Sequence, residues 1–452
     1  MFFTQFCHRC TGFVCDGCVF RKKWEGVVSS KLVSRSKKIV MVAACPFPAN
    51  HGSPASIREM SEALVSLGHD VHIVTYPISE DIPVTGPTIH RVPRVPFSKS
   101  NAIKVGPALD KFFFNPFMVL KLIYVIFKYK IDVIHAHNYE GVLIGWLAKL
   151  ITRKPLLYNA VNSMADELPT YDFFKNKDLA RKLAWVLDKT LPFRGDHVTT
   201  VSDDLKHFLV DLGIEKEKIT VLPAGVFPEM FDESDPQSIY DRHGLNADGM
   251  YMMYTGSLDA FQRIDYLIDT AARVIKIEPT AKLLIVCNID NPDAKNKYLD
   301  YAASLGIADN VLFFDHVPLD ELSSYLAIAN VAIIPRPECP GHPVKVLNYM
   351  SARKAIAGFV GGAKGLTHNK DALIVANHDL DALAEQVVVL LRDKELRIRL
   401  GNSARDVVDQ FYTWGRLAQG LDVIYDHLLG RVDESEFRSN LSEFVLENYS
   451  NS

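Results

Sequence analysis

Short runs of β-branched and other apolar residues alternate with helical segments from about residue 37 onward. Residues 38–44 (KIVMVAA) predict a buried strand, residues 54–67 carry the apolar spacing of a helix, and residues 69–75 predict the next strand after Gly68. Strands that alternate with crossover helices are typical of parallel sheets. The same alternation predicts strands at 133–135, 156–159, 198–201 and 219–222.

The pattern begins again after a turn-rich stretch at 223–248, with strands predicted at 251–255, 282–287, 311–314, 331–334 and 355–359. The expected fold is therefore α/β, with two tandem Rossmann-like doubly wound domains that face a cleft. Ligands of such sheets bind beyond the carboxyl ends of the strands. The expected divisions are an extension at 1–36, a first domain at 37–223, a linker at 224–248, a second domain at 249–411, a terminal helix at 412–429 that crosses back to the first domain, and a polar tail at 430–452.

Composition excludes several classes of protein. The 452 residues are 48% apolar, which suffices for large cores, and 50 basic against 54 acidic side chains give a net charge of −4. That balance argues against a nucleic-acid binder. Seven cysteines are too few for a disulfide scaffold, and no run approaches the roughly 20 apolar residues of a spanning helix. The first residues lack the order of a secretory signal, so a cytoplasmic protein is expected.

Four of the seven cysteines form a C-x2-C-x4-C-x2-C run at Cys7, Cys10, Cys15 and Cys18. Four thiolates can bind zinc, but zinc folds usually separate the two pairs by many more residues. The alternative is a solvated basic extension without a metal. No metal is assigned elsewhere in the chain.

The first domain offers two candidates at predicted strand ends. Gly52 lies in the loop before the helix at 54–67, where backbone N–H groups can meet an anion or form a plain turn. His137 ends the strand in IDVIHAHN, where a satisfied structural histidine is the alternative to a catalytic one. A dinucleotide fingerprint would need three spaced glycines, so a nicotinamide oxidoreductase is disfavoured.

The second domain carries two further candidate segments. In YTGSLDAFQRIDYL, Arg263 lies near a helix start, where a cation and helix N–H groups suit phosphate; a surface arginine is the alternative. The segment 334–350 (IPRPECPGHPVKVLNYM) feeds a Pro/Gly loop into a helix on which Lys345 and Asn348 share a face. Such a loop is difficult to explain unless it shapes a site.

These motifs, in this order, resemble glycosyltransferase family 4, which comprises retaining, nucleotide-sugar-dependent enzymes with the GT-B fold. The resemblance spans about 37–429 and includes SIREMSEALVSLGHDVHIVT, IDVIHAH, DHVTTVSDDLKHFLVDLG, YTGSLDAFQRIDYLI and GHPVKVLNYMSARKAI followed by GGAKGL. It implies transfer from a nucleoside diphosphate sugar without a required metal or other cofactor. Three residues are expected to carry the chemistry, namely His137, Arg263 and Lys345. The expected donor-binding residues are Gly52, Gly256, Ser257, Arg336, Glu338, Gly341, His342, Pro343, Val344 and Asn348.

The chain departs from the family pattern at several positions. Ser257 stands where arginine is common and Gln262 where lysine is common. Of the family's paired glutamates, Asn348 occupies the second position and Pro340 the first, with Glu338 two places earlier. These differences leave open a non-catalytic protein that binds nucleotide sugar or carbohydrate.

The expected partners are a nucleotide sugar and a glycan or lipid-linked acceptor, without nucleic acid. Residues 111–130 (KFFFNPFMVLKLIYVIFKYK) combine aromatic side chains with lysines, a composition suited to peripheral contact with the inner face of a membrane. A buried crossover helix is the alternative for this segment.

Overall fold

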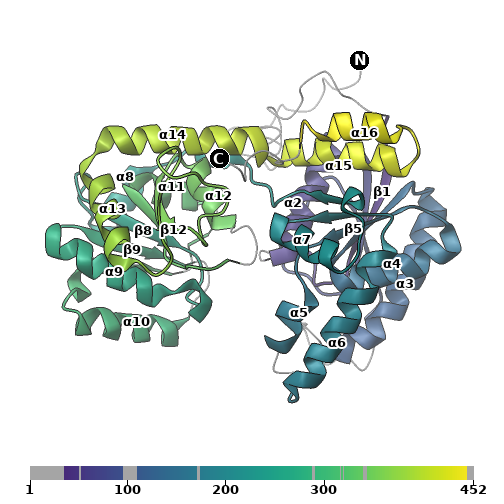
Figure 1. The fold of residues 1–452 in the computed structure, drawn as a ribbon, viewed down its shortest axis with the longest axis horizontal. Helices are drawn as coiled ribbons and strands as arrows, with labels where there is room; N and C mark the ends of the chain where they lie inside the picture. Colours follow the sequence, from purple (N-terminus) through teal and green to yellow (C-terminus); the bar gives the residue numbers. More distant parts are fainter. Residues whose placement is uncertain are drawn as a thin grey trace, which may run out of the picture.

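The computed structural model describes residues 35–49, 52–94, 109–170, 174–287, 291–315, 317–318, 320–339 and 344–444 (Figure 1). Two all-parallel sheets with helices on both faces form two domains, which confirms the predicted α/β class. The four clustered cysteines, and residues 340–343 of the Pro/Gly loop, lie outside the described residues.

The first sheet has the strand order β3-β2-β1-β4-β5-β6-β7. Its strands are β1 (Lys38–Ala43), β2 (Asp70–Thr75), β3 (Thr88–Arg91), β4 (Val133–His137), β5 (Leu156–Ala160), β6 (His197–Thr200) and β7 (Ile219–Val221). The helices of this half are α2 (Gly52–Ser66), α3 (Leu109–Tyr129), α4 (Asn138–Thr152), α5 (Met164–Glu167), α6 (Lys177–Thr190) and α7 (Asp203–Asp211).

The second sheet has the order β10-β9-β8-β11-β12-β13. Its strands are β8 (Tyr251–Thr255), β9 (Lys282–Val286), β10 (Val311–Phe314), β11 (Val331–Ile334), β12 (Ala355–Phe359) and β13 (Leu373–Val375). The remaining helices are α8 (Pro236–His243), α9 (Ile264–Ile277), α10 (Pro292–Ser304), α11 (Leu322–Ile328), α12 (Val344–Ser351), α13 (Leu380–Arg392), α14 (Lys394–Phe411), α15 (Trp414–Leu428) and α16 (Glu434–Leu441).

Successive residues of β1 belong to different cores, because side chains alternate between the faces of a strand. Val40 and Val42 pack with residues of α3 and α4, whereas Ile39, Met41 and Ala43 pack with residues of α2 and α15. A helix from the far end of the chain therefore completes one face of the first sheet. Figure 1 shows α14 running along the second domain into α15, which lies on the first.

The chain crosses between the domains twice, and the two crossings are hydrogen-bonded to each other. The amide of Val226 donates to the carbonyl of Tyr412 at 2.9 Å, and the amide of Trp414 donates to the carbonyl of Val226 at 3.2 Å. A Cβ at Gly225 would lie 2.5 Å from the Trp414 ring, so the close approach requires glycine. Trp414 is 2% exposed, and its Nε1 donates to Glu59 of α2 at 2.8 Å.

Several expected boundaries differ from the structure. The stretch 224–248, expected as a linker, contains α8, whose Ile239 is buried in a core of the second domain. The expected tail at 430–452 begins with α16, whose Phe437 is 2% exposed and packs against α15 residues. The helices α8 and α16 each carry only two apolar residues, so their hydrophobic pattern is weak. The sequence pattern does not predict the edge strands β3 and β13: β3 is largely polar with no buried residue, and β13 is only three residues long.

We expect Trp414→Ala to cost about 3–5 kcal/mol of stability, because it empties a large site where α15 packs on the first domain. Denaturant unfolding followed by a probe in the first domain measures the loss. Trp185→Ala is the control, because Trp185 is 61% exposed on α6 and its removal should cost less than about 0.5 kcal/mol. Equal midpoints for the two variants would contradict the assigned role of the crossing.

Candidate functional site

Each sheet has one place where the chain reverses its direction of winding. In the first sheet this is the boundary between β1 and β4, and in the second it is the boundary between β8 and β11. The loops that leave the carboxyl ends of such a strand pair diverge, which makes these places the usual ligand sites of doubly wound sheets. Lys364, after β12, forms an ion pair with Asp204 at the start of α7, so the carboxyl edges of the two sheets contact each other.

His137 is the last residue of β4 and lies at the first of these places. It is 1% exposed and is in register with Ala43 of β1. Asn159 Nδ2 on β5 lies 3.1 Å from His137 Nδ1, and His137 Nε2 has no hydrogen-bond partner among the described residues. Burial lowers the pKa of His137 to about 3, so the ring is neutral near pH 7. A neutral ring can donate one hydrogen bond from Nε2 but cannot act as a cation.

The preceding inward-facing residue, His135, connects this strand end to the terminal helix. The rings of His135 and His137 are 4.4 Å apart, and His135 Nδ1 lies 2.8 Å from the hydroxyl of Tyr425 on α15. Burial places the pKa of His135 well below the usual value. The terminal helix therefore supports the strand that carries His137.

Gly52 begins α2 beside this strand end. Its φ of +52° lies in the left-handed region, and it is exposed. The next residue, Ser53, donates from Oγ to Asn138 Oδ1 at 3.4 Å. Asn138 follows His137 directly, so the loops after β1 and β4 meet here.

Gly256 follows β8 at the second of these places, and its lack of a side chain leaves room for an amine. Its φ is +135°, and a Cβ there would lie 2.8 Å from Lys345 Nζ. Lys345, in the first turn of α12, donates to the hydroxyl of Tyr254 at 2.7 Å and to Gln262 Oε1 at 2.8 Å. Both partners are neutral. Burial, with a further contribution from the charge of Arg336, lowers the pKa of Lys345 to about 7.

Arg336 follows β11 and provides a second cation near Lys345. Its guanidinium donates to Cys339 Sγ, and its Nε is buried without a hydrogen-bond partner among the described residues. Gly361 and Gly362 press against the backbone of this loop. A Cβ at Gly361 would lie 1.9 Å from the carbonyl oxygen of Pro337, and one at Gly362 would lie 2.3 Å from that of Arg336. The loop that carries Arg336 is therefore held by backbone packing that only glycine permits.

Arg263 already has a partner. Its guanidinium donates to Asp265 at 2.7 and 2.9 Å and lies 3.4 Å from the ring centroid of Tyr266. Its φ of +57° turns the chain into α9. To hold a phosphate, the Arg263 guanidinium would have to bind it together with Asp265 or give up its hydrogen bonds to Asp265.

The other predicted donor-binding residues lie around this loop and α12. Ser257 Oγ donates to Asp259 Oδ2 at 2.6 Å, Glu338 is exposed, and Val344 begins α12 with 49% exposure. Asn348 is half-buried one turn after Lys345. Gly341, His342 and Pro343 lie outside the described residues and stay predictions from sequence.

Sequence reasoning missed the residues that hold Lys345 and α12 in place. The hydroxyl of Tyr349 accepts from the amide of Thr255 at 2.8 Å, which fastens α12 to the end of β8. Tyr254 faces Lys345 from the same strand. Neither tyrosine has a sequence signal beyond an apolar pattern. Among the described residues, no three His, Cys, Asp or Glu side chains are grouped so as to hold a metal ion.

The two halves match two family models in sequence. One, described as Glycosyltransferase Family 4, matches residues 51–229, and one described as Glycosyl transferases group 1 matches residues 249–393. The chain is 26% identical over 411 residues to a D-inositol 3-phosphate glycosyltransferase of Stackebrandtia nassauensis, covering 87% of this chain and 90% of that protein. It is 25% identical over 406 residues to the protein of that name from Thermobispora bispora, covering 84% and 91%.

Solved structures share the fold. Sucrose-phosphate synthase from Thermosynechococcus elongatus superposes with a TM-score of 0.71 at 18% identity, over 88% of this chain and all of that one. Anabaena HepE in complex with UDP gives 0.65 at 15% identity, over 86% and all of that chain. At these identities the likeness establishes the fold.

We expect Gly256→Ala to displace the Lys345 amine into water, so that the pKa of Lys345 rises from about 7 toward the ordinary value of about 10.4. Titration of the lysine Cε signals by NMR, with Lys345→Arg to assign the resonance, measures this shift. Gly244→Ala is the matched control, because Gly244 also has a positive φ but nothing lies within 4 Å of an added Cβ. A low pKa retained in Gly256→Ala would show that the glycine does not create the amine's site.

Proposed function

Because the chain belongs to glycosyltransferase family 4 and has the GT-B fold, we propose that it transfers a sugar from a nucleoside diphosphate sugar to an acceptor hydroxyl with retention at the anomeric carbon. The observation that carries this proposal is a pair of cations, Lys345 and Arg336, near the boundary between β8 and β11, where the second sheet reverses its direction of winding. Lys345 is held there by neutral oxygens and lies near Arg336. Two cations brought together in this way favour the binding of an anion.

The main chemical demand of the reaction is the charge of the departing diphosphate. As the bond between C1 and the phosphate oxygen breaks, negative charge grows on that oxygen, and preoriented cations stabilise it. Lys345 and Arg336 supply this charge, and Arg263 adds to it by exchanging Asp265 for phosphate. The proposed reaction needs no metal ion, because these side chains offset the negative charge of the diphosphate. Gly341, His342, Pro343 and Val344 are proposed to complete the phosphate loop, with Gly256 and Ser257 beside it.

Retention follows if the acceptor attacks from the face that the diphosphate leaves. The acceptor oxygen bonds to C1, and its proton passes to the departing phosphate oxygen, so the step balances without a protein nucleophile. His137, neutral near pH 7, donates from Nε2 to a sugar hydroxyl, with Gly52 opposite. Glu338 and Asn348 are proposed to hydrogen-bond hydroxyls of the donor. The relatives' names make inositol 3-phosphate the first soluble acceptor to test.

A second candidate is a nucleotide-sugar binder that has lost turnover. The observation that favours it is the loss of cations, since Ser257 and Gln262 replace basic residues of the family pattern and Arg263 is paired with Asp265. Binding without release of nucleoside diphosphate would support this candidate.

Turnover is tested with a panel of nucleotide sugars and inositol 3-phosphate, following release of nucleoside diphosphate and the configuration of the product. We expect His137→Ala and Lys345→Ala each to lower kcat/KM by about 100-fold or more, as loss of one such donor does elsewhere. Lys216→Ala is the control, since Lys216 is exposed and remote from the strand ends. Unchanged turnover in both site variants, or an inverted product, would overturn the proposed mechanism.

The depressed pKa of Lys345 predicts how donor binding depends on pH. A bound diphosphate favours the charged amine, so above pH 7 binding must take up a proton and the affinity for UDP should fall, by up to about tenfold per pH unit. Below pH 7 the amine is already charged and this dependence ends. Titration calorimetry between pH 7 and 9 measures this dependence. That range lies above the pH at which the nucleotide's own phosphate titrates, since its second pKa is about 6. Lys345→Met should bind UDP more weakly, with an affinity that does not change over this pH range. An equally steep fall in affinity in this variant would exclude Lys345 as the source of the pH dependence.

We also propose peripheral membrane contact through α3, on the cytoplasmic side. The helix buries Phe114, Met118, Leu122 and Val125 against the sheet, yet its opposite face exposes a second apolar stripe. That stripe consists of Phe113, Phe117, Leu120, Tyr124 and Phe127, which are 42–64% exposed. Lys121 and Lys128 flank Tyr124 at 5.8 and 5.2 Å from its ring centroid. None of the described helices is long and apolar enough to cross a membrane.

The membrane contact is tested by flotation with vesicles that contain acidic phospholipid. We expect Leu120→Ser with Phe127→Ser to lower vesicle binding by about tenfold or more, because two exposed apolar side chains are lost from the contact. Ile277→Ser with Ile398→Ser is the control, since both residues are exposed on the second domain. Equal loss in the two variants, or no binding by the parent protein, would end this proposal.

A further inference from the structure

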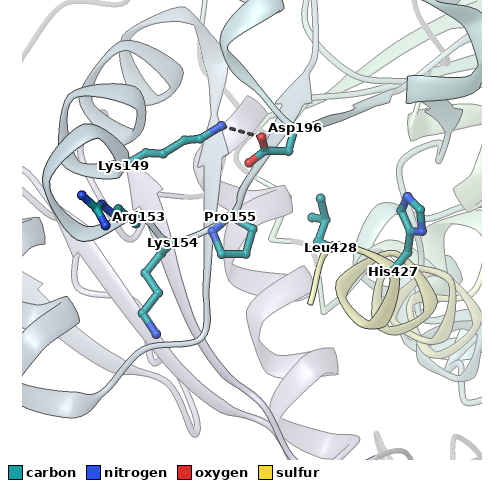
Figure 2. Close-up of a pocket in the computed structure, with 7 residues that line it drawn as sticks. All are labelled: Lys149, Arg153, Lys154, Pro155, Asp196, His427 and Leu428. Atoms are coloured by element: carbon teal, nitrogen blue, oxygen red, sulfur yellow. Dashed lines mark hydrogen bonds and ion pairs between the residues drawn. The ribbon is translucent and has the colours of Figure 1, made fainter. Parts of the chain in front are cut away.

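A shallow surface cavity of about 470 Å³, wide open to solvent, lies on the first domain (Figure 2), at the edge of the first sheet opposite the edge where His137 lies. Its walls are the end of α4, the start of β5, the turn before β6 and the end of α15. Because β5 and β6 begin here, the cavity is at the amino edge, one sheet length from the strand ends that carry the proposed site.

The cavity carries an excess of positive charge. Lys149 pairs with Asp196, whose second oxygen accepts from the amide of Leu156 at 2.8 Å, so these two charges offset each other. Arg153 and Lys154 form no ion pair within the described part of the chain. Figure 2 shows them on one side of the cavity, with His427 and Leu428 of α15 on the other side. Two uncompensated cations therefore line one wall.

Cations at the end of a helix also have an ordinary role, because they offset the negative end of the helix dipole. Lys149 and Arg153 satisfy that role for α4, since one lies in its last turn and the other is its C-cap. Lys154 lies beyond the helix and is only partly exposed. The helix dipole therefore does not account for Lys154, which also lines the cavity.

An aromatic contact supports the opposite wall. The His427 ring stacks on Phe437 of α16 with centroids 4.1 Å apart and planes inclined by 15°. Phe437 is 2% exposed. The terminal helices therefore hold the cavity open beside the cations of α4.

Exposed apolar side chains border the cations. Leu147, Leu150 and Ile151, in the last turns of α4, are 37, 61 and 60% exposed. The helix α4 packs against α3, and both run toward this edge of the sheet. A basic pocket beside an apolar rim is the chemistry that recognises a phosphate group attached to an apolar body.

We propose that this cavity binds the phosphate group of an anionic ligand through Arg153 and Lys154, and that at a membrane this ligand is the headgroup of an acidic phospholipid. The membrane part rests on the proposed contact of α3, whereas phosphate binding does not. The site anchors or orients the first domain and takes no part in sugar transfer.

The test compares two variants with the same change in charge. Arg153→Gln with Lys154→Gln removes the cations of the cavity, and Lys216→Gln with Lys218→Gln removes two exposed cations elsewhere on the first domain. Binding of inorganic phosphate and glycerol 3-phosphate is measured by calorimetry, and binding of phosphatidylcholine vesicles containing phosphatidic acid by sedimentation. We expect the cavity variant to lose about 25-fold in vesicle affinity, since each cation near an anionic surface contributes about fivefold. The control should bind as the parent does.

Each outcome decides the proposal. Loss of both soluble-phosphate and vesicle binding in the cavity variant alone supports it with a lipid source. Loss of soluble-phosphate binding alone supports the cavity and assigns a soluble ligand. Equal loss in the two variants, or unchanged binding in the cavity variant, overturns it. Leu120→Ser with Phe127→Ser should weaken vesicle binding but keep phosphate binding, which separates failure of the membrane proposal from failure of the cavity proposal. Sugar transfer in the cavity variant should stay at the parent's rate, which separates the cavity proposal from the transferase proposal.

Discussion

The burial of the Lys345 amine against neutral oxygens is the interaction on which the account of this protein depends. Tyr254 and Gln262 accept its hydrogen bonds, and Arg336 adds a like charge nearby. A buried cation in such a setting is destabilised in its charged form, which is why its pKa falls. An arriving diphosphate relieves that cost. Lys345 is therefore a cation whose charged form is most stable when an anion is bound beside it.

The rest of the fold holds that cation and brings the other half of the site to it. Tyr349 fastens α12 to the end of β8, and Gly361 and Gly362 let their backbone close on the loop that carries Arg336. The paired crossings at Val226 and Trp414, together with α15, join the first domain to the second. Through Tyr425 and His135, the same helix reaches the strand of His137. Domain connection and site support are therefore shared by the C-terminal helices.

The strand pattern was sufficient to predict both sheets apart from β3 and β13, because parallel strands are buried on both faces and appear as continuous apolar runs. It also placed His137 and Gly256 at strand ends, and Lys345 on the helix that follows the Pro/Gly loop. The short polar strand β3 and the helix α16 lack such runs. The partners of Lys345 could not be predicted, since Tyr254, Gln262 and Lys345 come from three elements that only the tertiary fold brings together. Arg263 was expected to be available for phosphate; its pairing with Asp265 depends on a local left-handed turn that the sequence pattern does not reveal.

The most direct test of the central claim is a crystal structure of the protein with a nucleoside diphosphate. We expect the diphosphate to lie beyond the carboxyl ends of β8 and β11, within hydrogen-bond distance of Lys345 Nζ and close to Arg336. The amine should then have exchanged Gln262 or Tyr254 for a phosphate oxygen. A diphosphate bound elsewhere, with Lys345 still hydrogen-bonded to both neutral partners, would contradict it.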